Sequence, residues 1–169
     1  GADALMLSGE TSVGEFPIES VKIMARIIER TEEIALDQIP PLKHSPATKG
    51  GAITKAATEV GLTVGAKYLV AFTQSGDSAR RMSRLRSPIP MLALTPDTGT
   101  YNRLALSWGV ESLLTPVVNH TDEMVMQVDT ILINAKRVNL GDLVLIVAGS
   151  PPGIPGSINA MRVHKIGDA

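Results

Sequence analysis

The chain has 169 residues, which is enough for one ordinary domain with an appended segment. Hydrophobic residues make up 44% of it and aromatic residues only 3%, so we expect a core of aliphatic side chains. The net charge of −1 and the lack of a long apolar run give no support to a nucleic-acid or membrane partner. The absence of cysteine excludes a disulfide scaffold and thiolate metal sites, and it suits the cytoplasm. The first residue is Gly1 and not methionine, which favours a fragment or a processed product.

The first 38 residues contain a candidate strand and an amphipathic helix. Residues 4–7 form an apolar run that is typical of a buried strand, and a polar loop follows them. Pro17 predicts the start of a helix, because the first helical position needs no backbone N–H. Apolar side chains then recur at helical spacing and form one stripe: Ile18, Val21, Met24, Ala25 and Ile28. One strand and one helix do not fold stably alone, so we expect this segment to belong to a larger body.

Residues 39–50 are rich in proline and lack periodicity, which predicts a linker between two domains. His44 lies among these turn residues, which favours an exposed side chain over a metal ligand. His120 and His164 are far apart in sequence, and no histidine lies at metal-ligand spacing. We therefore expect no metal site in this chain.

The remaining residues, 51–169, alternate between helical and strand patterns. Helices are expected at residues 52–62, 79–86 and 98–109 and from residue 121, and strands at 68–72, 91–94, 110–116, 143–147 and 158–166. This alternation predicts an α/β domain of three layers, with helices on both faces of the sheet. Only about ten residues separate the last two strands, which is short for a parallel crossover. We therefore expect a five-stranded mixed sheet whose fifth strand is antiparallel and lies at or near an edge.

A polar turn follows the first strand of this domain and precedes a helix. Its backbone N–H groups and the hydroxyls of Thr73, Ser75 and Ser78 could bind a phosphate. The alternative is that Ser78 or Asp77 only caps the helix. Sequence alone leaves both interpretations open at this point.

The N-terminal segment closely resembles the last strand and helix of the pyruvate kinase barrel, a (β/α)₈ fold. The matching residues are 3–11, Gly14, Pro17 and 19–21. The resemblance implies that Ser8 and Glu10 border the active site, where phosphoenolpyruvate gives its phosphoryl group to ADP. It makes Ser8 a candidate for the proton relay to enolpyruvate and gives Glu10 the role of ordering the loop. The alternative is that both residues only brace the loop before the helix.

Much of the catalytic apparatus of that family has no counterpart in these residues. The resemblance implies that the parent enzyme uses Mg²⁺ and K⁺ and that their ligands lie upstream of Gly1. No pair of residues in the chain replaces them. We therefore expect the 169-residue chain to be inactive as a kinase by itself.

Residues 51–169 resemble the carboxy-terminal allosteric domain of pyruvate kinases along their whole length. The match lies in residues 73–76, 79–80, 83–84, Arg86, Pro88, 108–110, 141–142, Gly149, Pro151, Gly153, Gly156, Ser157 and Asn159. It implies a site for a phosphorylated effector in a cytoplasmic, glycolytic homotetramer. The phosphate cradle would be Thr73, Gln74, Ser75, Gly76 and Ser78. The lid would be residues 150–157, including Gly153, Gly156 and Ser157.

Two departures from the family pattern bear on the effector. Asp77 stands where members that respond to fructose 1,6-bisphosphate carry a basic residue, and a carboxylate opposes a phosphate. Residues 119–131 lack the tryptophan and arginine that hold the second phosphate in those members. The sequence therefore favours a sugar monophosphate or AMP over the bisphosphate.

Other roles for the chain can be weighed from particular residues. The arginines Arg80, Arg81, Arg84 and Arg86 form a basic cluster that is either a solvated face or part of the effector site or a subunit contact. The resemblance favours the second reading. A free-standing phosphate-binding regulatory domain is the alternative to a part of pyruvate kinase, but such a domain needs no segment like residues 1–38. A phosphorylation-dependent receiver domain fits poorly, because it needs acidic residues where residues 73–75 stand.

Overall fold

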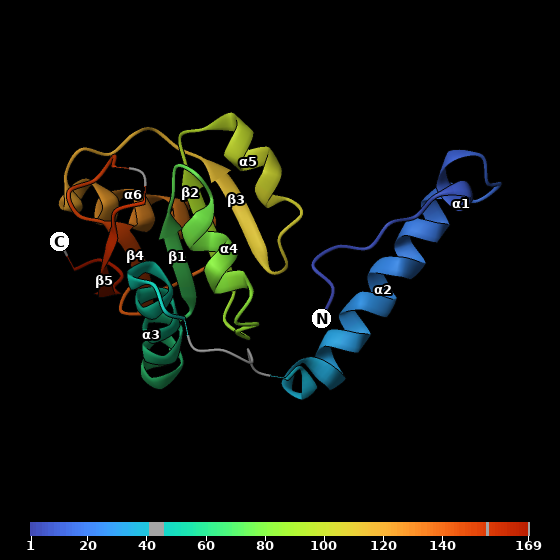
Figure 1. The fold of residues 1–169 in the computed structure, drawn as a ribbon, viewed down its shortest axis with the longest axis horizontal. Coiled ribbons are helices and arrows are strands. Elements are labelled where there is room, and N and C mark those ends of the chain that lie inside the picture. The colour runs from blue at the N-terminus through green and yellow to red at the C-terminus, as the bar shows by residue number, and fades with distance from the viewer. Residues whose placement is uncertain (41–45, 155, 169) are drawn as a thin grey trace. The chain divides into compact units, whose positions relative to one another are not determined.

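The computed structural model describes residues 1–40, 46–154 and 156–168 (Figure 1). The chain divides into two compact units, Gly1–Pro41 and Leu42–Ala169, which we call the N-terminal and C-terminal units. His44, which the sequence places in an exposed turn, and residue 155 of the expected lid lie outside the described residues.

The N-terminal unit consists of three helical elements, α1 (Gly9–Ser12), α2 (Pro17–Ala35) and the 3₁₀ helix η1 (Leu36–Gln38). The predicted start of a helix at Pro17 is confirmed, and Pro17 occupies the first turn. The predicted buried strand at residues 4–7 is wrong for this structure, because these residues form no strand and Leu5 and Met6 are exposed. A strand is stable only beside a hydrogen-bonded neighbour, and the described part of this unit supplies none.

The C-terminal unit is built on one five-stranded sheet with the order β3-β2-β1-β4-β5. The strands are β1 (Tyr68–Phe72), β2 (Met91–Thr95), β3 (Val110–Leu114), β4 (Leu143–Gly149) and β5 (Ile158–Lys165). All pairs are parallel except β4 with β5. The predicted mixed sheet with a reversed fifth strand at an edge is therefore confirmed.

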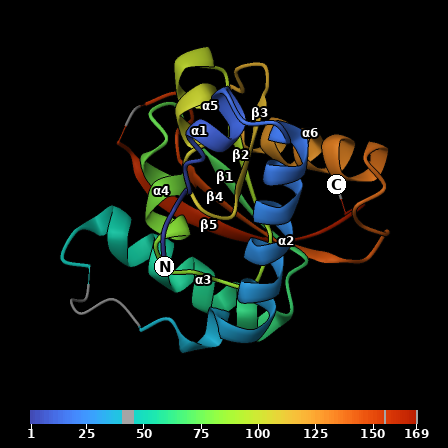
Figure 2. The same ribbon diagram turned by 90° about the vertical axis from the view of Figure 1, so that its right-hand side faces the viewer.

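Helices cover both faces of this sheet (Figures 1 and 2). They are α3 (Lys49–Val64), α4 (Asp77–Ser83), α5 (Thr98–Leu104) and α6 (Thr121–Asn134). One core cluster joins the sheet to residues of α3, α4 and α5, and the other joins it to α6. The three-layer α/β arrangement predicted from the alternating pattern is confirmed.

Strand β1 shows how the sequence produces these layers. Leu69 and Ala71 pack into the cluster on the side of α3, whereas Val70 packs into the cluster on the side of α6. Side chains of a strand alternate between the two faces of a sheet, and each face here is covered by helices. A continuous apolar run is therefore what a central strand of this sheet requires.

Two helices of the C-terminal unit end earlier than the sequence pattern suggests. Helix α4 ends at Ser83, and Arg86 has a positive φ of 51°. Helix α5 ends at Leu104, although the pattern continued to residue 109. The segment after each helix end is a short turn that leads to the next strand, so its apolar residues do not continue the helix.

Candidate functional site

A pocket lies at the carboxyl ends of the parallel strands of the C-terminal unit. This edge is where open α/β sheets bind ligands. The turn after β1 forms one wall, and the loop from β4 to β5 forms another. The residues that line it from these two segments are Phe72, Thr73, Gln74, Ser75, Asp77 and Ser78, and Gly149, Pro152, Gly153, Ile154, Gly156, Ser157 and Ile158. The predicted cradle and the predicted lid, which are far apart in the sequence, thus line one pocket.

The turn after β1 is held by side chains from within it and from two helices. The hydroxyl of Thr73 accepts a hydrogen bond from the backbone N–H of Gly76 (2.9 Å). The carbonyl of Gln74 accepts from the Thr100 hydroxyl of α5 (2.6 Å), and the carbonyl of Ser75 accepts from Nη2 of Arg80 (3.1 Å). These bonds fix the path of the backbone before any ligand is considered.

Gly76 is the N-cap of α4 and has a left-handed φ of 81°. A side chain at this position would be strained, and its Cβ would lie 2.7 Å from Nη1 of Arg80. The hydroxyl of Ser75 accepts from the backbone N–H of Asp77 (3.4 Å), at the first position of α4. Neither Ser78 nor Asp77 is the N-cap of this helix, so the alternative in which one of them serves only as its cap is wrong. Gly76 itself does not line the pocket, although its four predicted companions in the cradle do.

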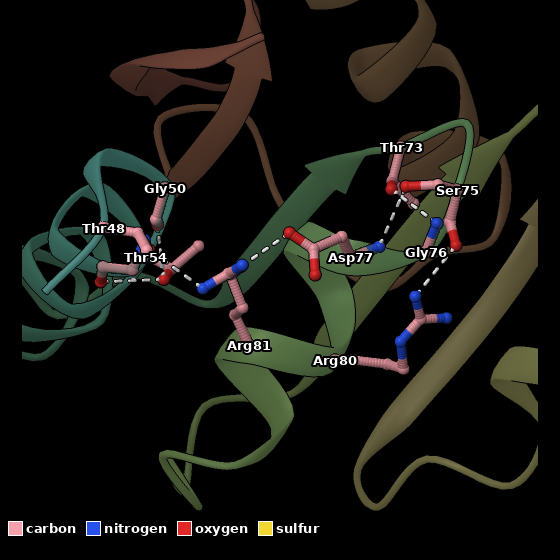
Figure 3. Close-up of polar contacts among 10 residues, drawn as sticks. Thr48, Gly50, Thr54, Thr73, Ser75, Gly76, Asp77, Arg80 and Arg81 are labelled. Carbon is pink, nitrogen blue, oxygen red and sulfur yellow. Dashed lines mark hydrogen bonds and ion pairs between the residues drawn. The ribbon is translucent and has the colours of Figure 1, made fainter. Parts of the chain in front are cut away.

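The carboxylate of Asp77 is paired with Arg81 one helical turn later. Oδ2 of Asp77 accepts from Nε of Arg81 at 2.6 Å. Figure 3 shows that this side chain points toward Arg81 and away from Thr73 and Ser75. The positive charge of Arg81 therefore offsets much of the repulsion that we expected between the Asp77 carboxylate and a phosphate.

Thr100 links the turn to the start of α5. Its backbone N–H donates to Oδ1 of Asp97 (2.6 Å), the N-cap residue of that helix. This hydrogen bond, together with the nearby side chain of Thr100 and the charge of Arg103, holds the pKa of Asp97 below its ordinary value of 3.8. Thr100 is not predicted from the sequence, where only its place two residues into a helix that starts at Thr98 suggests a bracing role.

The loop after β4 is anchored by Asn159 at its far end. Oδ1 of Asn159 accepts from the backbone N–H of Ser150 (2.7 Å), and its Nδ2 donates to the carbonyl of Ser150 (2.6 Å). Gly153 and Gly156 have φ values of 84° and 75°. The two ends of the loop are therefore tied together, while its glycines take conformations that other residues rarely adopt.

The other walls of the pocket are mostly apolar, with the polar side chain of Thr115 among them. Leu94 and Pro96 come from the end of β2, and the segment after β3 and helix α6 contribute Pro116, Val117, Val118 and Met124. Among the described residues that line the pocket, Asp77 is the one charged residue. The site thus combines hydroxyls and backbone groups on one side with aliphatic surface on the other.

The family model for the α/β domain of pyruvate kinase matches residues 51–164. The chain belongs to the pyruvate kinase family. A pyruvate kinase of Mycobacterium tuberculosis is 51% identical over 99% of this chain, and that of Corynebacterium glutamicum is 45% identical over the same share. In both cases the chain spans only 35% of the relative's length. A solved structure of a Cryptosporidium parvum pyruvate kinase has a TM-score of 0.81 and covers 95% of this chain and 32% of its own, but at 24% identity it supports the fold alone.

The two residues that the pyruvate kinase resemblance places beside the active site lie in the N-terminal unit. Oε2 of Glu10 accepts from the backbone N–H of Ser8 (3.1 Å), and the hydroxyl of Thr11 donates to the Ser8 carbonyl (3.0 Å). Glu10 thus folds back on the start of α1. Both side chains belong to exposed residues.

The described residues contain no group of three histidine, aspartate or glutamate side chains that could hold a metal ion. Within the same residues, no helix is both long and apolar enough to cross a membrane.

Proposed function

We propose that this chain is the regulatory part of a pyruvate kinase that transfers a phosphoryl group from phosphoenolpyruvate to ADP. In this proposal residues 1–38 belong to the last β/α unit of the catalytic (β/α)₈ barrel, where residues 4–7 would form a strand only beside the rest of the barrel. Residues 39–50 are the linker, and 51–169 are the allosteric domain. The observation that carries the regulatory role is the single pocket formed by the turn after β1 and the loop after β4. A ligand in this pocket would contact two segments at once and would change how they are held.

The ligand that we propose is a phosphorylated small molecule, with the phosphate on the Thr73–Ser78 side. Thr73, Gln74, Ser75 and Ser78 supply polar groups there, and Gly153, Gly156 and Ser157 belong to the facing loop. The described lining residues include no lysine or arginine that could pair with a second phosphate. This favours a sugar monophosphate or AMP over fructose 1,6-bisphosphate.

The assignment of the N-terminal unit to a barrel is supported by its exposed apolar surface. Ile18 and Val21 of its apolar stripe are exposed, Ile23 and Ile27 on another face are exposed as well, and no residue of this helix is buried. An amphipathic helix normally buries such a stripe against a neighbouring element. In the proposed parent enzyme the rest of the barrel covers it, Mg²⁺ and K⁺ are held by residues of that barrel, and subunits form a cytoplasmic homotetramer.

Ser8 and Glu10 would border the active site of the complete barrel. The contact between Glu10 and the Ser8 backbone supports a loop-ordering role for Glu10. The hydroxyl of Ser8 would take part in the proposed proton relay to enolpyruvate. Both proposed roles require the remaining strands and helices of the barrel.

Isothermal titration calorimetry of the full 169-residue chain tests the regulatory proposal. Glucose 6-phosphate and AMP should each be titrated beside fructose 1,6-bisphosphate. We expect a monophosphate to bind more tightly than the bisphosphate. Ser75→Ala should weaken its binding by about tenfold, because a hydrogen bond to a charged group is lost.

Ser20→Ala, in α2 of the other unit, is the matched control and should bind as the unchanged chain does. Binding of none of the three ligands would refute the regulatory proposal. Tightest binding of fructose 1,6-bisphosphate would overturn the preference for a monophosphate.

A lactate dehydrogenase-coupled assay tests the proposal that this chain does not catalyse phosphoryl transfer without the rest of the enzyme. With phosphoenolpyruvate, ADP, Mg²⁺ and K⁺ present, we expect no turnover from the purified chain above the blank. Turnover that scales with the concentration of the chain would show that these residues contain a complete active site.

A free-standing regulatory domain is the alternative function, and the two-sided core of the C-terminal unit favours it. Both faces of this sheet are covered from within the unit. The intact mass of the native gene product separates the two proposals. A product about three times the mass of this chain supports the enzyme, and one near 17.9 kDa supports the free-standing domain.

A further inference from the structure

Arg81 joins the wall of the pocket to the beginning of helix α3. Its Nε donates to the Asp77 carboxylate at 2.6 Å, and its Nη1 donates to Oγ1 of Thr48 at 3.2 Å. Thr48 is the N-cap of α3, and the same Oγ1 accepts from the backbone N–H of Gly51 (3.2 Å). Figure 3 shows the three side chains in a row from α4 to α3.

A second contact reaches the same helical turn from the other wall of the pocket. A Cβ on Gly50 would lie 2.7 Å from Cγ2 of Ile158, so the two residues are in close approach. Ile158 lines the pocket and is the first residue of β5, directly after the loop. Only glycine fits at position 50 without moving that side chain.

The first turn of α3 is itself held together as a unit. The buried hydroxyl of Thr54 lies within hydrogen-bond distance of two carbonyls, those of Gly50 (2.9 Å) and Gly51 (3.0 Å), and can donate to either. A displacement at Thr48 or Gly50 therefore moves the whole turn. In sequence, this turn comes just after the segment that connects the two units.

We propose that the first turn of α3 senses whether the pocket is occupied, with Arg81 as the positioning residue that connects them. The proposal rests on the proposed function of the pocket. A ligand that orders the turn after β1 fixes Asp77, and one that orders the loop after β4 fixes Ile158. Both walls contact the first turn of α3. When a ligand orders the two walls, we therefore expect this turn to unfold locally less often.

The chemistry of arginine is what makes this connection specific. A guanidinium group presents several N–H donors in a rigid plane, so it can bond two acceptors in different directions. The Asp77 carboxylate and the Thr48 hydroxyl use two different nitrogens of Arg81. Arg81→Lys keeps the positive charge but removes this fork, whereas Arg84→Lys, at the C-cap of the same helix, is the matched control.

Hydrogen exchange of the full chain without ligand tests the connection directly. Thr48→Val touches only the α3 side, yet it should speed exchange of the Gly76 and Asp77 amides by about fivefold. In an Arg81→Lys background, Thr48→Val should add nothing there. Thr48→Ser keeps the hydroxyl and should behave as the unchanged chain. A Thr48→Val effect confined to α3 would overturn the proposal.

The same measurement with glucose 6-phosphate or AMP separates this proposal from the function of the pocket. Bound ligand should slow exchange of residues 49–54, and Arg81→Lys should remove that protection. Protection of residues 73–78 and 149–158 alone refutes the sensing turn but supports the ligand site. Coupling between Thr48 and Asp77 without binding of either probe supports the connection and refutes the proposed ligand class.

Discussion

Helices α2 and α3 differ in burial more than their sequences suggest. Helix α2 has 19 residues and an apolar stripe rich in isoleucine, but none of its residues is buried. Helix α3 has 16 residues, and it buries small ones, namely Gly51, Thr54, Ala57, Thr58 and Gly61. The comparison shows that an apolar stripe marks a surface for burial, whereas actual burial depends on the element that covers it.

The largest expected effect compares one apolar side chain in each unit. Leu132 of α6 is fully buried, whereas Ile27 of α2 is 57% exposed. Leu132→Ala should lower the free energy of unfolding by about 2–5 kcal/mol, because it leaves a cavity in the core. Ile27→Ala should change it by less than about 0.5 kcal/mol.

Urea unfolding of the full chain, followed by circular dichroism, measures both changes. If Ile27→Ala costs as much as Leu132→Ala, helix α2 is covered by a partner within the 169 residues. The contrast between the two units would then be lost. A matching pair of small effects would instead show that the C-terminal unit lacks a packed core.

A smaller effect is expected at a partly buried polar pair of the C-terminal unit, His164 and Asp129. Nε2 of the buried His164 lies 2.7 Å from Oδ1 of Asp129, and Oδ2 of Asp129 accepts from the backbone N–H of Gly167 (3.1 Å). Asp129→Asn replaces an acceptor with a donor and should cost about 1–3 kcal/mol of unfolding free energy. Asp122→Asn, an exposed change on the same helix, is the control and should be nearly neutral in urea unfolding. Equal unfolding midpoints for both variants would mean that this pair does not hold β5 to α6.

The smallest effect concerns acid and the N-cap of α5. The folded-state pKa of Asp97 lies below 3.8, so its carboxylate stabilises the fold above that pH. This contribution is lost as the pH falls through the lowered pKa. We expect Asp97→Ser to reduce the Tm at pH 6, and the difference from the unchanged chain should shrink as the pH is lowered toward 3. A difference that stays constant over this range would contradict a role for the charged carboxylate.

The sequence predicted the sheet of the C-terminal unit well, because its strands are short apolar runs between glycine-rich turns. The reversal of β5 followed from the length of one loop. The strand expected at residues 4–7 was wrong, because an isolated segment carries no information about whether a pairing partner is present. The ends of α4 and α5 were also missed, since apolar residues continue beyond the last helical turn.

The candidate site was predicted in its segments but not in its contacts. Sequence motifs and family resemblance named the turn and the loop, and the structure brings both to one pocket. Pairing of Asp77 with Arg81 could be inferred from their spacing of four residues on a helix. The contact of Arg81 with Thr48 could not, because it joins residues 33 positions apart and depends on how α3 packs on α4.

Amide chemical-shift mapping of the full chain, titrated with AMP or glucose 6-phosphate, tests the central claim most directly. The claim is that the turn after β1 and the loop after β4 form one binding site. We predict that amides of residues 73–78 and of residues 149–158 shift together and give one common Kd. Shifts confined to one of the two segments, different Kd values for them, or shifts only elsewhere in the chain would contradict it.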